Sequence, residues 1–187
     1  AARLGVVMGT LAQERAAKSA GAKLARDKLT LVTSPQIADF GDLVEQLIAE
    51  STGKEGKGIL PVVGEPLGSP EVYDQDRLFV YLQLAGDQTH KAALDKLAAA
   101  GHPVVCFPLR DRYDLGRQFF LWEFATAVAG YCLKINPFNQ PNVESAKRLA
   151  RQMIDEYTEK GELPARESAP VTAEALQAFM QQAKSGD

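Results

Sequence analysis

The residues that could do chemistry gather first in the stretch EQLIAESTGKEGKG, residues 45–58. It is typical of the end of an amphipathic helix that runs into a glycine- and lysine-rich turn. Glu50 falls in the last turn of this helix, where the negative end of the helix dipole raises the basicity of a carboxylate. A general base benefits from that position, although a solvated glutamate at a helix end is the commoner case on spacing alone. Gln46 lies one turn earlier, on the same helix face.

The turn at residues 53–58 resembles a phosphate cradle only superficially. It follows the carboxyl end of a helix, where the dipole repels anions, and it lacks the spacing of a phosphate-binding loop. We therefore expect Lys54 and Lys57 to be solvated, or at most to attract an anion over a long range.

Two further charged residues lie on apolar helices. Lys147 lies at the edge of an apolar stripe, so it either extends its stem along the surface or points into a cleft as a cation or acid. Glu123 lies in an almost wholly apolar helix, where a buried carboxylate must be hydrogen-bonded or paired. Its expected role is structural support.

The remaining reactive residues form no catalytic pattern. His90 and His102 have no carboxylate or cysteine at triad or metal-ligand spacing, and no serine stands in a nucleophile-elbow motif. We expect no metal and no cofactor. Cys106 and Cys132 lie in apolar segments without CxxC spacing, which predicts buried thiols in a reducing compartment, the cytoplasm.

Composition excludes several classes of partner. The 187 residues are 45% hydrophobic and 24% charged, with a net charge of −3, which is ordinary for a globular domain and gives no electrostatic footprint for nucleic acid. No apolar run approaches the roughly 20 residues that cross a bilayer. The chain begins at Ala1 without an initiator methionine, so we expect a piece of a longer protein.

The elements that must position these residues alternate along the chain. Continuous apolar strands that alternate with helices predict a parallel sheet covered on both faces. We expect strands at 28–33, 59–63, 78–84 and 103–108, and helices at 3–21, 35–53, 89–100, 116–133, 143–157 and 172–184. The helix at 35–53 should begin with Ser34 as its N-cap, and the helix at 116–133, apolar almost all round, should be central.

Three stretches carry a family resemblance. QLIAESTGKEGKG, then GEP at 64–66, then WEFATAVAGYCLKINPFNQPNVESAK from Trp122 closely resemble the C-terminal half of the glucose-6-phosphate isomerase family. RDKLTLVTSP and LIAESTGKEGKG are most similar to the isomerase part of bacterial fusion proteins in which a transaldolase precedes the isomerase. The resemblance implies an α/β fold, a three-layer αβα sandwich with a doubly wound, mainly parallel sheet. It makes residues 1–160 a C-terminal sugar-isomerase (SIS) domain, followed by a linker and helix at 161–187.

The resemblance also implies the site and the reaction. The family motif Gln-x3-Glu-Ser-x-Gly-Lys gives Glu50 the role of base and Gln46 that of a substrate-binding glutamine. A second motif, at residues 138–147, makes Gln140 a sugar-phosphate contact and Lys147 the lysine near the ring oxygen. The implied enzyme is a cytoplasmic aldose–ketose isomerase of glycolysis, gluconeogenesis and the pentose phosphate pathway. It interconverts glucose 6-phosphate and fructose 6-phosphate through a cis-enediol.

The sequence departs from the family pattern in three places. The stretch LGSPEVYDQDRLF lacks the ring-opening histidine, Phe124 stands where many relatives have histidine, and the N-terminal SIS domain with its phosphate loop is absent. We therefore expect weak activity of this chain alone, with the missing N-terminal SIS part, and a transaldolase part in a fusion, as partners in one polypeptide of a homo-oligomer. The alternative is a non-catalytic module that binds sugar phosphate, but such a sensor needs neither the base Glu50 nor the cation Lys147.

Overall fold

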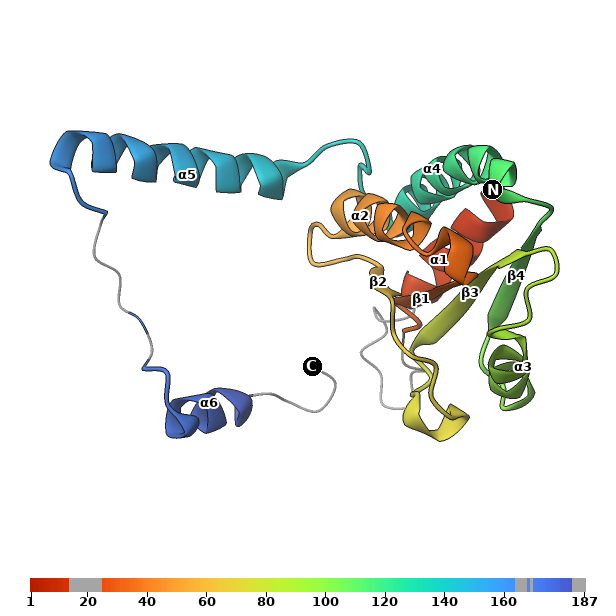
Figure 1. Ribbon diagram of the computed structural model, residues 1–187. Coiled ribbons are helices and arrows are strands. Elements are labelled where there is room, and N and C mark those ends of the chain that lie inside the picture. The colour runs from red at the N-terminus through yellow and green to blue at the C-terminus, as the bar shows by residue number, and fades with distance from the viewer. Residues whose placement is uncertain (14–24, 164–167, 169, 183–187) are drawn as a thin grey trace. The chain divides into compact units, whose positions relative to one another are not determined.

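The computed structural model describes residues 1–13, 25–163, 168 and 170–182 (Figure 1). The chain divides into two compact units, Ala1–Asn142 and Val143–Asp187, and each is described by itself. The division expected at residue 160 stays a prediction.

The first unit is built on a four-stranded parallel sheet with the order β2-β1-β3-β4. Its strands are β1 (Lys28–Thr33), β2 (Leu60–Val63), β3 (Arg77–Leu84) and β4 (Val104–Leu109). From β1 the chain first adds β2 on one side, then crosses back to add β3 and β4 on the other. The sheet is therefore doubly wound.

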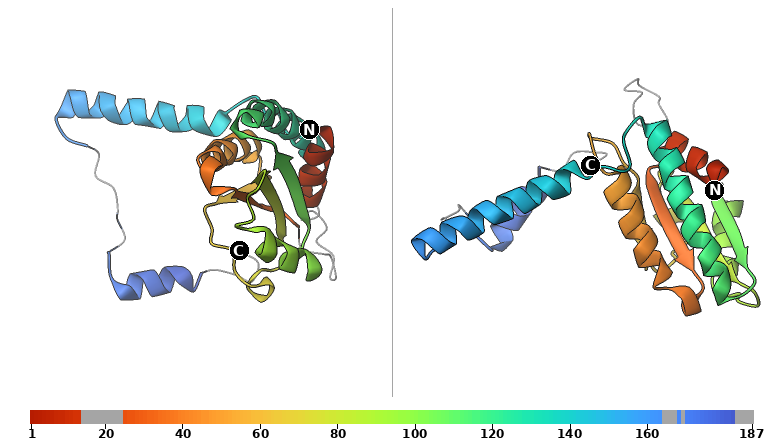
Figure 2. Two further views of the ribbon diagram at one scale, coloured as in Figure 1. Left: turned by 45° about the vertical axis from the view of Figure 1, so that its right-hand side comes forward. Right: turned by 90° about the horizontal axis from the view of Figure 1, so that it is seen from above.

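Helices cover both faces of the sheet, as Figures 1 and 2 show. Helix α2 (Phe40–Thr52) connects β1 to β2, and α3 (Lys91–Ala99) connects β3 to β4 on the opposite face. Right-handed crossovers that run in opposite directions require opposite faces. Helices α4 (Leu115–Leu133) and α1 (Ala2–Gln13) complete the α2 layer. The predicted three-layer αβα sandwich is confirmed.

Alternate strand residues divide the interior into two cores, because successive side chains of a strand point to opposite faces. In β3, Val80 and Leu82 join the core beneath α1, α2 and α4, whereas Phe79 and Tyr81 join the core beneath α3. All four are at most 2% exposed. The continuous apolar strand pattern in the sequence arises from this burial on both faces.

Helices α1 and α4 cross at very short range. A Cβ atom added to Gly5 would lie 2.4 Å from the carbonyl oxygen of Ala125, and one added to Gly9 would lie 2.6 Å from the Cβ of Cys132. Helix α1 ends at Gln13, and the stop predicted at Gly21 lies outside the described residues.

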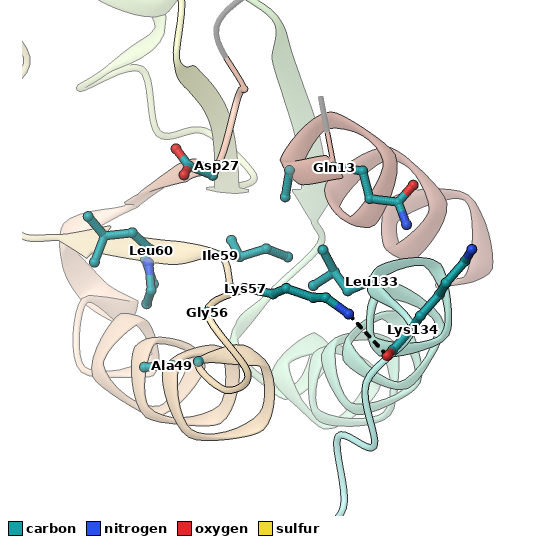
Figure 3. A pocket seen from close by; sticks show the side chains of 13 residues that line it. Gln13, Asp27, Ala49, Gly56, Lys57, Ile59, Leu60, Leu133 and Lys134 are labelled. Carbon is teal, nitrogen blue, oxygen red and sulfur yellow. Dashed lines mark hydrogen bonds between the residues drawn. The ribbon is translucent and has the colours of Figure 1, made fainter. Parts of the chain in front are cut away.

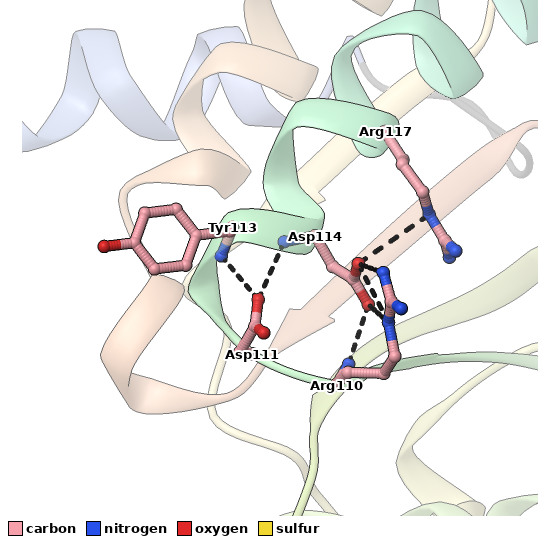
Figure 4. A network of polar contacts seen from close by, with 5 residues as sticks. All are labelled: Arg110, Asp111, Tyr113, Asp114 and Arg117. Carbon is pink, nitrogen blue, oxygen red and sulfur yellow. Dashed lines mark hydrogen bonds and ion pairs between the residues drawn. The ribbon is translucent and has the colours of Figure 1, made fainter.

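Helix α4 is central but not buried all round, which corrects the prediction from its composition. Trp122 and Ala129 are fully buried, whereas Phe119, Phe120 and Phe124 are exposed. Its start is fixed by the polar network of Figure 4, which surrounds the short helix η4 (Arg112–Asp114): Asp114 pairs with Arg110 at 2.6 Å, and Asp111 accepts from the amide of Tyr113 at 2.8 Å.

Ser34 does not cap a helix through its side chain, contrary to the prediction. The chain first makes the short helix η2 (Pro35–Ile37), and the Ser34 hydroxyl, fully buried, donates to Asp87 Oδ2 at 2.5 Å. Burial, together with a hydrogen bond to the same carboxylate, raises the pKa of Tyr81 to about 12. The side chain of Ser34 thus ties the ends of β1 and β3 together, because its oxygen also accepts from the amide of Leu84.

The buried thiols predicted from the sequence are also corrected. Cys106 is exposed on β4 and Cys132 is partly exposed on α4. Strand β4 lies at the edge of the sheet, so its side chains are less covered than those of β1 and β3.

The second unit contains most of α5 (Pro141–Lys160) and all of α6 (Ala173–Met180). Thr172 caps α6, because its hydroxyl oxygen accepts from the amide of Ala175. Helix α6 ends four residues before the predicted end, and α5 is longer at both ends. Within the described residues, no helix has the length and apolarity needed to span a membrane.

Candidate active site

Helix α2 places Gln46 and Glu50 one turn apart on its exposed face. Its opposite face is buried through Phe40, Val44 and Ile48. The helix ends at Thr52, one residue before the predicted end, and the Thr52 hydroxyl donates to the carbonyl of Ile48 at 2.8 Å and accepts from the amide of Ile59 at 3.0 Å. These bonds fix the last turn, and with it the position of Glu50.

A loop after α4 supplies the third predicted residue. Lys134 ends α4 in the left-handed conformation, with φ of 56°, and Ile135 is buried behind it. Pro137 then packs directly on Gly130, where an added Cβ would meet its ring at 2.8–3.0 Å. The loop is thereby held close against α4 before it reaches Gln140.

Both oxygens of the Glu50 carboxylate are held by carboxamides. Gln46 Nε2 donates to Oε1 at 3.1 Å, and Gln140 Nε2 donates to Oε2 at 2.9 Å, from 90 positions further along the chain. The structure therefore brings together three of the residues predicted from the sequence. A carboxylate held by two N–H donors has a fixed orientation, which is what a proton-transfer base needs.

Glu50 borders a hollow of about 370 Å³ between α2 and α4, which Gln46, Gln140, Leu43, Leu47, Ser51, Phe119 and Glu123 also line. Glu123 is exposed there, so the expectation of a buried, paired carboxylate is wrong. Its role as structural support stays a prediction. Neither histidine of the chain is among the lining residues.

Lys147 belongs to the second unit. Its Nζ lies 3.2 Å from Glu144 Oε1 on the same helix, α5. A place for Lys147 beside Glu50 therefore stays a prediction.

Lys54 is a residue near the site that the sequence pattern did not indicate. Its side chain is buried, with 4% exposure, where solvation was expected. Its Nζ donates to the carbonyl of Asn136 at 2.9 Å and to both the carbonyl and the side-chain oxygen of Asn139. The signal for this role is the density of asparagines in INPFNQPN, but spacing alone does not connect that segment to a lysine some 80 positions earlier. Lys57 is exposed as expected.

The chain reverses direction in a tight turn between Lys54 and Lys57. The amide of Lys57 donates to the carbonyl of Lys54 at 3.0 Å, and both central residues have positive φ, 58° at Glu55 and 69° at Gly56. This is a type I′ turn, in which glycine is the least strained second residue. The turn directs the two lysines into different surroundings.

A larger hollow of about 870 Å³ lies where α1, α2 and α4 end, and Figure 3 shows it. Its lining includes Gln13, Gly53 and Leu133 from those helix ends, and Lys57, which donates to the carbonyl of Lys134 at 3.4 Å. Three helices present their carboxyl ends there, which disfavours an anion. None of the residues predicted for the site lines it.

The fold and the site define a parallel α/β sandwich that carries one carboxylate fixed by two glutamines. Among the residues that the structure describes, no group of histidine, cysteine and acidic side chains could hold a metal ion. The solved structure of a hypothetical protein from Thermus thermophilus has the same fold, with a TM-score of 0.63 over 81% of this chain and 44% of that one, at 17% identity.

Sequence comparison is more specific. No family model matches the chain. Glucose-6-phosphate isomerase of Heliobacterium modesticaldum is 28% identical over 65% of this chain and 36% of its own length. The enzymes of the same name from Mycoplasmopsis pulmonis and Streptococcus pyogenes serotype M18 are 32% and 31% identical, over 55% and 61% of this chain. The chain spans about a third of the length of these relatives.

Proposed function

We propose that the chain is the C-terminal sugar-isomerase part of a glucose-6-phosphate isomerase, with Glu50 as the base. The observation that carries the proposal is the Glu50 carboxylate, held by Gln46 and Gln140 at the border of a hollow. The similarity to relatives named glucose-6-phosphate isomerase supports the choice of reaction.

The reaction requires one base that gives back the proton it takes. In the open-chain aldose, Glu50 removes the proton from C2 while the C1 carbonyl oxygen gains a proton, which gives a cis-enediol. Loss of the proton on the C2 oxygen then forms the ketone, and the protonated Glu50 returns its proton to C1. Gln46 and Gln140 orient the carboxylate for both transfers. Lys147, from α5, is assigned the opening of the sugar ring and the stabilisation of negative charge on oxygen.

The proposal also concerns the two thirds of the relatives' length that this chain does not span. The relatives are about three times as long as the part they share with this chain, so we assign most phosphate contacts to a preceding SIS domain of the same polypeptide. In the fusion form, a transaldolase precedes both domains. The 187-residue chain alone should then isomerise fructose 6-phosphate far more slowly than the longest form that carries it. Equal turnover by the two forms would contradict this division of the site.

Glu50→Gln tests the base in the longest form of the protein, in an assay coupled to glucose 6-phosphate oxidation. Glutamine keeps the shape of the side chain but cannot accept the proton, so we expect kcat to fall by about 10²- to 10⁴-fold. Deuterium incorporation from D2O into the sugar should fall in parallel. The matched control is Glu45→Gln, an exposed glutamate on the same helix that does not line the hollow. A Glu50→Gln enzyme with full activity would refute the assignment.

A further inference from the structure

Lys54 is the one cation in the described part of the chain that is both buried and bonded entirely to a single distant loop. Its ammonium group has three acceptors, the carbonyls of Asn136 and Asn139 and the side-chain oxygen of Asn139. The nearby Lys57 is exposed and makes one long contact, at 3.4 Å. The two lysines of the turn therefore differ sharply in what they do.

Burying an ammonium group is costly unless its donors are satisfied. An ammonium has three N–H donors, and here three oxygens receive them. Two of those oxygens are backbone carbonyls, so the bonds fix the path of the loop itself and not only the side chains on it. Hydrogen bonds from a charged donor are also stronger than neutral ones.

The clamped loop leads directly to the Glu50 carboxylate. Gln140, which donates to Glu50 Oε2, is the residue after Asn139. Two residues further on, the side chain of Asn142 donates to the carbonyl of Gly53, the residue before Lys54. The turn after α2 thus holds the chain on both sides of Gln140.

We propose that Lys54 is a positioning residue of the site: it holds the loop 136–140 so that Gln140 keeps its hydrogen bond to Glu50. Lys54 touches neither the carboxylate nor the hollow, and acts through Gln140. The inference rests on the proposed function, because it makes the positioned carboxylate the base.

The first test follows the position of the Gln140 side chain by NMR and requires no activity assay. The side-chain amide of Gln140 is assigned by NMR in the 187-residue chain, and the fluorescence of Trp122, the single, fully buried tryptophan, reports an intact core. In Lys54→Met we expect a shifted Gln140 side-chain resonance and about tenfold faster backbone amide exchange at Asn136 and at residues 138–140. The control Lys57→Met leaves both unchanged. Wild-type behaviour of Gln140 in Lys54→Met would overturn the proposal.

The second test is a double-mutant cycle in the longest form of the protein. We expect Lys54→Met to lower kcat/KM by about 10- to 100-fold, the range for losing hydrogen bonds to a charged group. In a Gln140→Ala background the same change should lower it by less than about threefold, because Lys54 then has nothing left to position. A residue that only stabilises the fold would give the same factor in both backgrounds, and that result would overturn the proposal.

A milder variant covers the case in which Lys54→Met does not fold. Asn139→Ala removes one of the three acceptors, and it should shift the Gln140 resonance in the same direction by a smaller amount. An unchanged resonance in that variant would contradict the proposal. The proposed function fails separately: if Glu50→Gln isomerises normally, Glu50 is not the base, whatever the NMR experiment shows about Lys54.

Discussion

Replacing Gly130 by alanine should damage the site while leaving the stability of the fold nearly unchanged. Gly130 lies on α4, and a Cβ atom there would meet three atoms of the Pro137 ring at 2.8, 2.9 and 3.0 Å. The proline ring is rigid, so it cannot turn away from the added methyl group as a flexible side chain would. The loop that carries Pro137 must therefore move as a whole.

The size of that movement follows from the contact distances. Ordinary van der Waals contact begins near 3.4 Å, so the closest ring atom must retreat by about 3.4 − 2.8 = 0.6 Å to reach it. If Gln140 moves with the loop, its 2.9 Å bond to Glu50 stretches to about 3.5 Å, beyond a normal hydrogen bond. Displacement on this scale is enough to cost roughly tenfold or more in a catalytic rate.

The free energy of unfolding should change little, because the cost of overpacking and the gain in helix propensity oppose each other. Overpacking costs about 1–3 kcal/mol in a closed core, but less where a loop can yield. Alanine is favoured over glycine inside a helix by about 1 kcal/mol. Because these two effects nearly cancel, we expect the free energy of unfolding of Gly130→Ala to stay within about 1 kcal/mol of wild type.

The matched control is Gly116→Ala, on the same helix, where an added Cβ meets nothing within 4 Å. That variant should gain about 0.4–1 kcal/mol and keep the wild-type Gln140 side-chain resonance. Urea unfolding followed by Trp122 fluorescence measures the first quantity, and NMR measures the second. If Gly130→Ala gains as much stability as Gly116→Ala and leaves the Gln140 resonance unchanged, Pro137 does not connect α4 to the site.

Two further predictions concern the framework. Gly9→Ala should destabilise the fold by about 1–3 kcal/mol in urea unfolding, since its Cβ would lie 2.6 Å from Cys132 Cβ and 2.9 Å from a backbone oxygen of α4, where nothing can yield easily. The hydrogen bonds from Arg110 hold the pKa of Asp114 well below its ordinary 3.8, so the stability this pair contributes is present above pH 3.8 and is lost as the pH falls further. Unfolding experiments from about pH 7 to about pH 2 should show a smaller loss in Asp114→Asn, and an equal loss would contradict the assignment.

Local sequence signals predicted the layers of the fold well. Strand β1 has the predicted bounds, and α2 ends within a residue of its predicted end, because continuous apolar runs, proline and glycine act over a few residues. Where a side chain's role depends on a distant partner, the same reasoning failed. Ser34 looks like a helix cap until Asp87 is placed beside it, and Lys54 looks solvated until the loop after α4 covers it.

The same distinction between local signals and distant partners applies to the site. The spacing of Gln46 and Glu50 predicts one face of one helix, where the two side chains bond to each other, but the bond from Gln140 to Glu50 depends on how the loop after α4 returns. Glu123 was misjudged for a related reason. An apolar helix suggests burial on all sides, yet the phenylalanines around Glu123 are themselves exposed.

The charges around Glu50 bear on which part of a sugar phosphate this hollow could receive. Its lining residues in the described part of the chain include two carboxylates, Glu50 and Glu123, and no lysine or arginine. The carboxyl end of α2 adds partial negative charge, and Lys54 already donates to three oxygens of the loop. A phosphate dianion is therefore disfavoured there, whereas the uncharged C1–C2 end of a hexose 6-phosphate, four carbons from its phosphate, is not. This hollow alone would lack the cations that phosphate recognition needs, which is consistent with the proposal that the phosphate contacts lie on another part of the protein.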